Sequence, residues 1–143
     1  MSVKYRHYQS NNPNSSKNGY WYARAVHNET VDLDYIAERI QRNSTAKKSD
    51  VLAVLTEMVE VMRDELQAGK RVKIDEMGTF KIAITSIGAK ELKDFTVKEN
   101  IKGVKLLFMP VIKRDATGKS YKPILRGTVV QEHKKYDKET TQP

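Results

Sequence analysis

Residues 68–80 read AGKRVKIDEMGTF, and this stretch decides the fold because the spacing of apolar residues changes within it. Upstream, apolar residues recur every three or four positions, as on one face of a helix; from Val72 and Ile74 onward they alternate with polar residues, as in a strand. Gly69 lies where the helical spacing ends. The stretch predicts a long helix followed by a β-hairpin, with Gly78 in a turn conformation closed to residues with a Cβ and Phe80 in the core.

Two amphipathic helices are predicted upstream of this stretch. The first is capped by Thr30, ends at Asn43 and carries apolar residues at helical spacing: Leu33, Ile36, Ala37 and Ile40. The second begins within residues 44–50 and carries a stripe of Val51, Leu55, Met58, Met62 and Leu66, widened by Val54, Val59 and Val61. This apolar surface is broader than so small a chain can cover alone, so we expect a partner subunit.

Downstream of Gly78 the alternation continues in two strands, at residues 79–85 and 104–108. Between them, residues 86–100 are polar and basic, and we expect this segment to have no core of its own and to be mobile until a partner binds. Residues 115–119 predict a turn and residues 128–131 a short strand. Residues 134–143 are too polar for a predicted element.

The N-terminal segment predicts a β-hairpin with a long connection, because aromatic-rich runs flank a loop of Asn, Pro, Ser and Gly at residues 10–19. We therefore divide the chain into an N-terminal extension (1–29), a central domain (30–114) and a partly disordered C-terminal extension (115–143).

The aromatic residues of the hairpin allow two interpretations. They are Tyr5, Tyr8, Tyr20, Trp21 and Tyr22. Such rings stack on the bases of single-stranded nucleic acid in some proteins. Strand alternation turns half of them inward, however, so packing in the core or at a dimer contact is the preferred interpretation.

Charge is distributed unevenly along the chain. The 26 Lys and Arg residues exceed the 18 Asp and Glu residues, which gives a formal net charge of +8. Residues 86–126 hold ten bases and only four acids, whereas residues 31–68 hold eight acids and five bases. A basic surface built by the segment after the helices points to a polyanionic partner.

Composition and motifs disfavour several classes of function. The chain has no cysteine, which excludes a disulfide scaffold and thiol chemistry, and it has no apolar run long enough to span a membrane. His7, His27 and His133 are scattered, and the sequence has no metal-binding, nucleophile-elbow or phosphate-loop motif. We expect a cytoplasmic protein that is not an enzyme and that has no cofactor, no metal, no small-molecule substrate and no membrane partner.

Two motifs carry a family resemblance. Residues 68–80 place a Gly at the end of a long helix, then a strand, a tight turn and Gly-x-Phe, and Leu107-Phe108-Met109-Pro110 is similar to an Ala-Phe-x-Pro motif. In this order and spacing, the two motifs resemble the bacterial histone-like HU/IHF family of DNA-binding proteins over residues 31–114. The aromatic segment at residues 20–26 is similar to a branch of that family with an extra N-terminal element.

The resemblance implies an α+β fold: an intertwined homodimer with a helical body, a three-stranded sheet and projecting β-arms that bend duplex DNA through the minor groove. The family's arm tip contains Arg-Asn-Pro, but residues 89–95 contain no proline. The basic positions of the outgoing strand fall on Ala83 and Thr85, and the residues after Pro110 support at most one helical turn. We therefore expect DNA binding with little sharp kinking.

Basic residues of the arm and its base are the predicted phosphate contacts. They are Lys90, Lys93, Lys98, Lys102, Lys105, Lys113 and Arg114. Alternatively, these residues only keep an edge hairpin soluble. Leu92 and Phe95 are candidates for a wedge that replaces the missing proline, although packing within the arm is the preferred interpretation.

The predicted function is sequence-tolerant binding and shaping of duplex DNA by a nucleoid-associated homodimer. The alternative is a protein-interaction or scaffolding module that keeps the dimeric fold without binding DNA. The charge of the arm favours the first hypothesis, whereas its lack of Pro and Arg favours the second.

Overall fold

The computed structural model describes residues 1–133, and the chain divides into two compact units. One unit runs from Val31 to Arg126 and contains the helices and the central sheet. The other combines Met1–Thr30 with the chain from Gly127 onward. The predicted tail at residues 134–143 lies outside the described residues.

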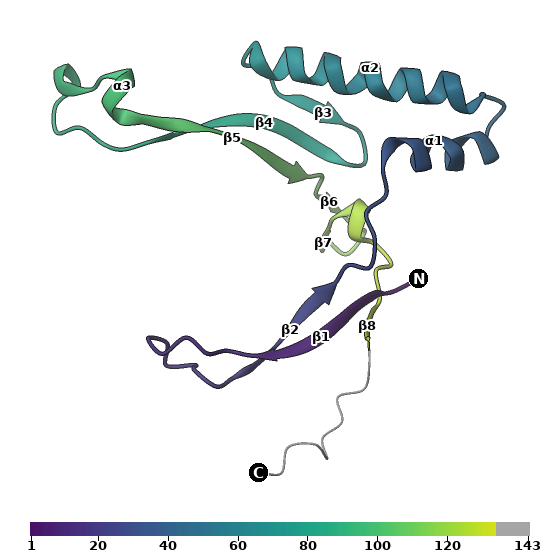
Figure 1. The fold of residues 1–143 in the computed structure, drawn as a ribbon, viewed down its shortest axis with the longest axis horizontal. Coiled ribbons are helices and arrows are strands. Elements are labelled where there is room, and N and C mark those ends of the chain that lie inside the picture. The colour runs from purple at the N-terminus through teal and green to yellow at the C-terminus, as the bar shows by residue number, and fades with distance from the viewer. Residues whose placement is uncertain (134–143) are drawn as a thin grey trace. The chain divides into compact units, whose positions relative to one another are not determined.

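The helices of the larger unit are α1 (Leu33–Arg42) and α2 (Lys48–Gln67), as the apolar spacing predicts (Figure 1). The predicted cap was wrong: Asp32, not Thr30, is the N-cap of α1, and its carboxylate accepts a hydrogen bond from the backbone N–H of Tyr35 at 2.9 Å. Asp32 directly precedes the first helical residue, which places its side chain within reach of that unpaired N–H. The Nζ of Lys48 donates to Asp34 at 2.7 Å and so links the two helices.

Helix α2 ends as the sequence predicts. Gly69 adopts φ +79°, its N–H donates to the carbonyl of Leu66, and the N–H of Lys70 donates to the carbonyl of Glu65. This pair of bonds is a Schellman motif, which satisfies the last carbonyls of a helix and favours glycine at the left-handed position.

The central sheet is antiparallel with the order β3-β4-β5, made of β3 (Val72–Ile74), β4 (Gly78–Ser86) and β5 (Ile101–Pro110). The turn before β4 corrects one prediction, because the positive φ of +64° belongs to Glu76 and not to Gly78. Phe80 is only half-buried, and its ring packs against that of Phe108 with centroids 4.8 Å apart.

The segment between β4 and β5 contains two short helical turns, η1 (Leu92–Asp94) and α3 (Val97–Asn100). Asn100 is only 5% exposed. Its Nδ2 donates to the carbonyl of Ile87 at 3.1 Å, and its Oδ1 accepts from the N–H of Thr96 at 2.9 Å. The segment was predicted to have no core of its own; the structure shows that one buried amide ties its two ends together.

Residues after Pro110 form a small antiparallel pair, β6 (Lys113–Arg114) with β7 (Ser120–Tyr121), and then the 3-10 turn η2 (Pro123–Leu125). The turn predicted at residues 115–119 is confirmed: the Asp115 carboxylate accepts from the N–H groups of Thr117 and Lys119, each at 2.9 Å.

The smaller unit is a three-stranded sheet with the order β2-β1-β8. The predicted hairpin is present as β1 (Val3–Gln9) and β2 (Trp21–Val26). The predicted C-terminal strand is β8 (Val130–Glu132), and it pairs in parallel with β1, a partnership that the sequence did not predict.

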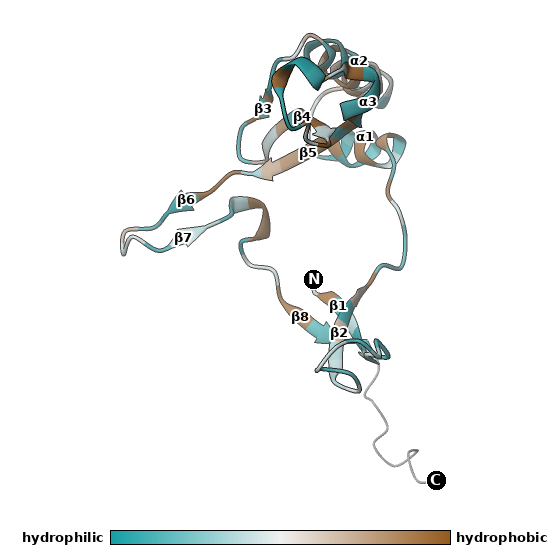
Figure 2. Ribbon diagram, turned by 90° about the vertical axis from the view of Figure 1, so that its left-hand side faces the viewer, coloured by the Kyte–Doolittle hydropathy of each residue, from teal (hydrophilic) through white to brown (hydrophobic). Residues whose placement is uncertain are grey.

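The apolar core of a single chain is small. Among the described residues, the buried apolar side chains are Ala37, Val51 and Leu66. Many larger apolar side chains on α2 and on the β4–β5 pair are exposed, and Figure 2 shows apolar residues on both elements. No helix within residues 1–133 is long and apolar enough to cross a membrane.

Candidate nucleic-acid interface

The β4–β5 pair has two chemically different faces, because side chains alternate across a sheet. One face is apolar over three consecutive cross-strand pairs: Phe80 with Phe108, Ile82 with Leu106, and Ile84 with Val104. The opposite face carries Thr79, Lys81, Ala83 and Thr85 on β4, across from Met109, Leu107, Lys105 and Gly103 on β5. The pair therefore separates an apolar face from a face that holds two lysines.

The predicted basic residues fall on three parts of the larger unit. Lys102 and Lys105 are on β5; Lys90, Lys93 and Lys98 are in the segment between β4 and β5; Lys113 and Arg114 form β6. All seven are exposed.

Two of these seven have acidic partners. The Nζ of Lys93 lies 2.7 Å from a carboxylate oxygen of Glu91, and the Nζ of Lys113 donates to Glu76. That hydrogen bond raises the pKa of Lys113. Within residues 1–133, no carboxylate lies within ion-pairing distance of the other five. These five cations are therefore exposed and have no acidic partner among the described residues.

Sequence reasoning missed Lys81. It lies on β4 opposite Leu107 and on the same face as Lys105. The signal was available, because Lys81 alternates with the apolar residues Phe80 and Ile82 and must therefore face away from them. The positions that are basic in the HU/IHF family fall elsewhere on this strand, so Lys81 was not among the predicted contacts.

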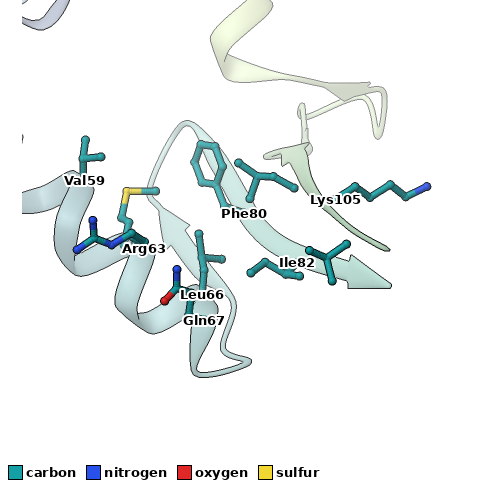
Figure 3. A pocket seen from close by; sticks show the side chains of 10 residues that line it. Val59, Arg63, Leu66, Gln67, Phe80, Ile82 and Lys105 are labelled. Atoms are coloured by element: carbon teal, nitrogen blue, oxygen red, sulfur yellow. The ribbon is translucent and has the colours of Figure 1, made fainter. Parts of the chain in front are cut away.

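An apolar groove of about 430 Å³ lies between α2 and the apolar face of the sheet. Val59, Met62 and Leu66 line it from the helix, and Phe80, Ile82 and Leu106 line it from the sheet. Figure 3 shows Lys105 at its rim, with the side chain extending away from α2. The groove leaves apolar surface of both elements open to solvent in a single chain.

The two wedge candidates differ in exposure. Leu92 lies in η1 and is 91% exposed, so the interpretation that it packs within the arm was wrong. Phe95 follows η1 and is less exposed.

Most aromatic residues of the N-terminal sheet are not packed in a core within one chain. Tyr8, Tyr20, Trp21 and Tyr22 are all exposed, whereas Tyr5 is half-buried and packs edge to face against His7.

No group of three His, Cys, Asp or Glu residues within residues 1–133 is arranged to hold a metal ion. The sequence has no match among curated proteins. Residues 1–121 match the family HU-HIG, described as an HU domain fused to wHTH, Ig, or Glycine-rich motif. Because this match spans most of the chain, and because the two helices and the three-stranded sheet lie inside it, the chain belongs to the HU-HIG family.

Proposed function

We propose that the protein is a homodimer that binds duplex DNA without reading its sequence and shapes it in the nucleoid, inside the cytoplasm. Membership of an HU-domain family supports a DNA-binding role. The observation that carries the proposal is the two-faced β4–β5 pair, whose lysine-bearing face leads into the basic segment at residues 87–100. Within the proposed DNA-binding domain, residues 30–114, one face is then available for DNA and the other for a second copy.

The phosphate contacts are assigned mainly to exposed lysines without an acidic partner. These are Lys90, Lys98, Lys102 and Lys105. The half-buried Lys81, on the same face as Lys105, is added to them. Lys93 and Lys113 contribute less, because Glu91 and Glu76 compete with the phosphates for their charge. Arg114 completes the set at the base of the pair. Each contact releases counterions from DNA and adds affinity that depends on salt but not on sequence.

A second copy of the chain is proposed to cover the apolar face. Val104 is 69% exposed although it lies in a strand that is apolar on this side, and the groove beside α2 continues the same surface. Contiguous apolar surface of this kind marks an interface in soluble proteins. Few apolar side chains are buried within one chain, so the dimer would supply most of the core.

The bend in DNA is proposed to be shallow. Residues 87–100 contain no proline and no arginine, so the wedge would be an apolar side chain. Leu92 is the better placed of the two candidates because it is almost fully exposed, whereas Phe95 is partly covered.

The test is retention of a random-sequence 30-base-pair duplex across a salt series. Lys90, Lys93, Lys98, Lys102 and Lys105 are changed together to Gln. The log–log salt slope is the slope of the logarithm of DNA affinity against the logarithm of salt concentration. Its magnitude is expected to fall by about 0.9 for each phosphate that the variant no longer neutralises. The control variant changes five exposed lysines elsewhere to Gln, namely Lys17, Lys47, Lys70, Lys73 and Lys122, so that both variants lose the same charge.

An equal decrease of the salt slope in the two variants would show that DNA binding depends only on net charge, which would contradict the assignment of the contacts to the arm. A parent protein that binds no duplex even at low salt would contradict DNA binding altogether. That result would favour the scaffolding hypothesis, in which the apolar face alone is functional.

A further inference from the structure

One face of the β1–β2 hairpin gathers cationic and aromatic side chains. The strand register pairs Lys4 with Val26, Arg6 with Arg24, and Tyr8 with Tyr22. Since alternate residues share a face, these six side chains lie on the same side of the N-terminal sheet. Three of them are cations and two are tyrosines.

Arg6 and Arg24 are direct cross-strand neighbours, which is unfavourable for two like charges. Neither β1 nor β2 contains an Asp or Glu. The one acid in the strands of this sheet is Glu132 on β8, which is in register with Tyr5 and lies 3.3 Å from Nδ1 of His7. Tyr5 and His7 alternate with Arg6, so this carboxylate belongs to the opposite face. The strands themselves therefore provide no carboxylate to neutralise the arginine pair.

Aromatic packing holds one of the two guanidinium groups in place. The guanidinium carbon of Arg24 lies 4.5 Å from the ring centroid of Tyr8. The rings of Tyr8 and Tyr22 are 5.7 Å apart and tilted by 31°. Both tyrosines remain more than a third exposed, at 38% and 37%. A guanidinium stacked on a ring keeps its N–H edges directed outward, which suits paired hydrogen bonds to a phosphate.

We propose that this face, made by Lys4, Arg6, Tyr8, Tyr22 and Arg24, is a second DNA-binding surface that grips the sugar–phosphate backbone. The proposal rests on the proposed DNA binding. It extends that binding to the smaller unit, whereas the lysines of the β4–β5 pair belong to the larger unit. The phosphates supply the counter-charge that the strands lack. Each unit of the chain then has its own contacts to the DNA backbone, and these contacts do not depend on base sequence.

The test uses the full chain with Arg6→Gln and Arg24→Gln combined, and it again measures duplex retention across a salt series. The log–log slope is expected to fall by about 1.8 for each protomer that engages DNA, from about 0.9 per phosphate. The matched control is Lys17→Gln with Lys47→Gln, which removes the same charge from exposed positions outside this face. The control slope is expected to match that of the parent protein.

Thermal stability provides a second measurement. If the role of Arg6 were purely structural, its replacement would lower the melting temperature and leave the DNA affinity unchanged. The single change Arg6→Gln removes the like-charge pair but keeps the contact between Arg24 and Tyr8. Its melting temperature is therefore expected to equal or exceed that of the parent protein while its DNA affinity falls. A lower melting temperature with unchanged DNA affinity would overturn the proposal.

The results separate this proposal from the proposed function. If the parent protein binds duplex and the double arginine variant keeps its slope, or loses no more than the control, the second surface is overturned and the arm lysines remain. If the arginine variant loses slope but the arm-lysine variant does not, the second surface is supported and the arm assignment fails. A parent protein that binds no DNA overturns both.

Discussion

A Cβ atom on Gly78 would lie 2.4 Å from the carbonyl oxygen of Met109. It would also lie 2.6 Å from Cε2 of the Phe108 ring. A ring can rotate away, but the carbonyl belongs to β5, which is in register with β4 at this point. Glycine is therefore required here because two strands approach closely. The residue with the left-handed conformation in the turn is Glu76.

Substitution Gly78→Ala tests this contact. The added methyl group forces the two strands apart, and such overpacking is expected to lower the free energy of unfolding by about 1–3 kcal/mol, with a larger loss for Gly78→Val. Urea denaturation measures the change. Gly88→Ala is the control, because a Cβ at Gly88 meets no atom within 4 Å and should change stability by no more than about 0.5 kcal/mol. Equal stability of the two variants would contradict the steric explanation.

Gly78 shows how far the sequence predicts this fold. Its position between two alternating segments indicated that glycine is needed there. The structural reason is the close approach of the Met109 carbonyl, which could not be predicted because Met109 is distant in sequence. Helices α1 and α2 and the hairpins were predictable because their signals are local periodicities and turn residues. The pairing of β8 with β1 was not, since three residues carry no information about a partner more than a hundred positions away.

The side chain of Asn100 is expected to hold the segment between β4 and β5 together. Asn100→Ala leaves the carbonyl of Ile87 and the N–H of Thr96 without their side-chain partner, at an expected local cost of about 1–3 kcal/mol. Amide hydrogen exchange should therefore accelerate at Thr96 and across residues 87–100, while the amides of α2 keep their protection. Glu99→Gln is the control at an exposed neighbour. Unchanged exchange at Thr96 would show that the buried amide does not organise the segment.

The pKa of Asp115 is expected to lie below its ordinary value of 3.8, because the hydroxyl of Thr117 donates to the carboxylate at 2.6 Å and two backbone N–H groups add to it. The folded-state pKa is lower than the unfolded one. The resulting stabilisation of the β6–β7 turn is thus present above pH 3.8 and is lost as pH falls through the folded pKa.

Carboxylate titration by NMR measures this shift directly. Thr117→Val removes the hydroxyl donor but leaves the backbone donors, so the titration midpoint of Asp115 should move up toward 3.8. Identical midpoints in the parent protein and in this variant would contradict the assigned cause.

The candidate interface was predictable in composition but not in geometry. The count of bases in residues 86–126 located the basic segment, yet it treated Lys93 and Lys105 as equivalent. The structure distinguishes them, because Glu91 pairs with Lys93 whereas Lys105 has a neighbour on its own face in Lys81. Such differences depend on rotamers and on strand register, which charge counting does not contain.

The proposed dimer predicts a strong effect at Val59. This residue lines the apolar groove from α2 and is 50% exposed in a single chain, so a change there creates no cavity within the chain itself. Val59→Glu would bury a carboxylate against the second copy, which is costly without a partner charge. The dissociation constant of the dimer should therefore rise at least about tenfold, which is a loss of about 1.4 kcal/mol of association free energy. Sedimentation velocity across a concentration series measures this change.

The control for this prediction lies on the polar side of the same helix. Ala53 is exposed and shares a face with Glu57 and Glu60 through spacings of four and three residues, so Ala53→Glu adds the same charge to a surface that is already acidic. Its dimerisation should match that of the parent protein. If Val59→Glu and Ala53→Glu dissociate alike, helix charge rather than the groove governs association. A folded parent monomer at low micromolar concentration would contradict the dimer itself, because one chain would then be stable with its widest apolar surface in water.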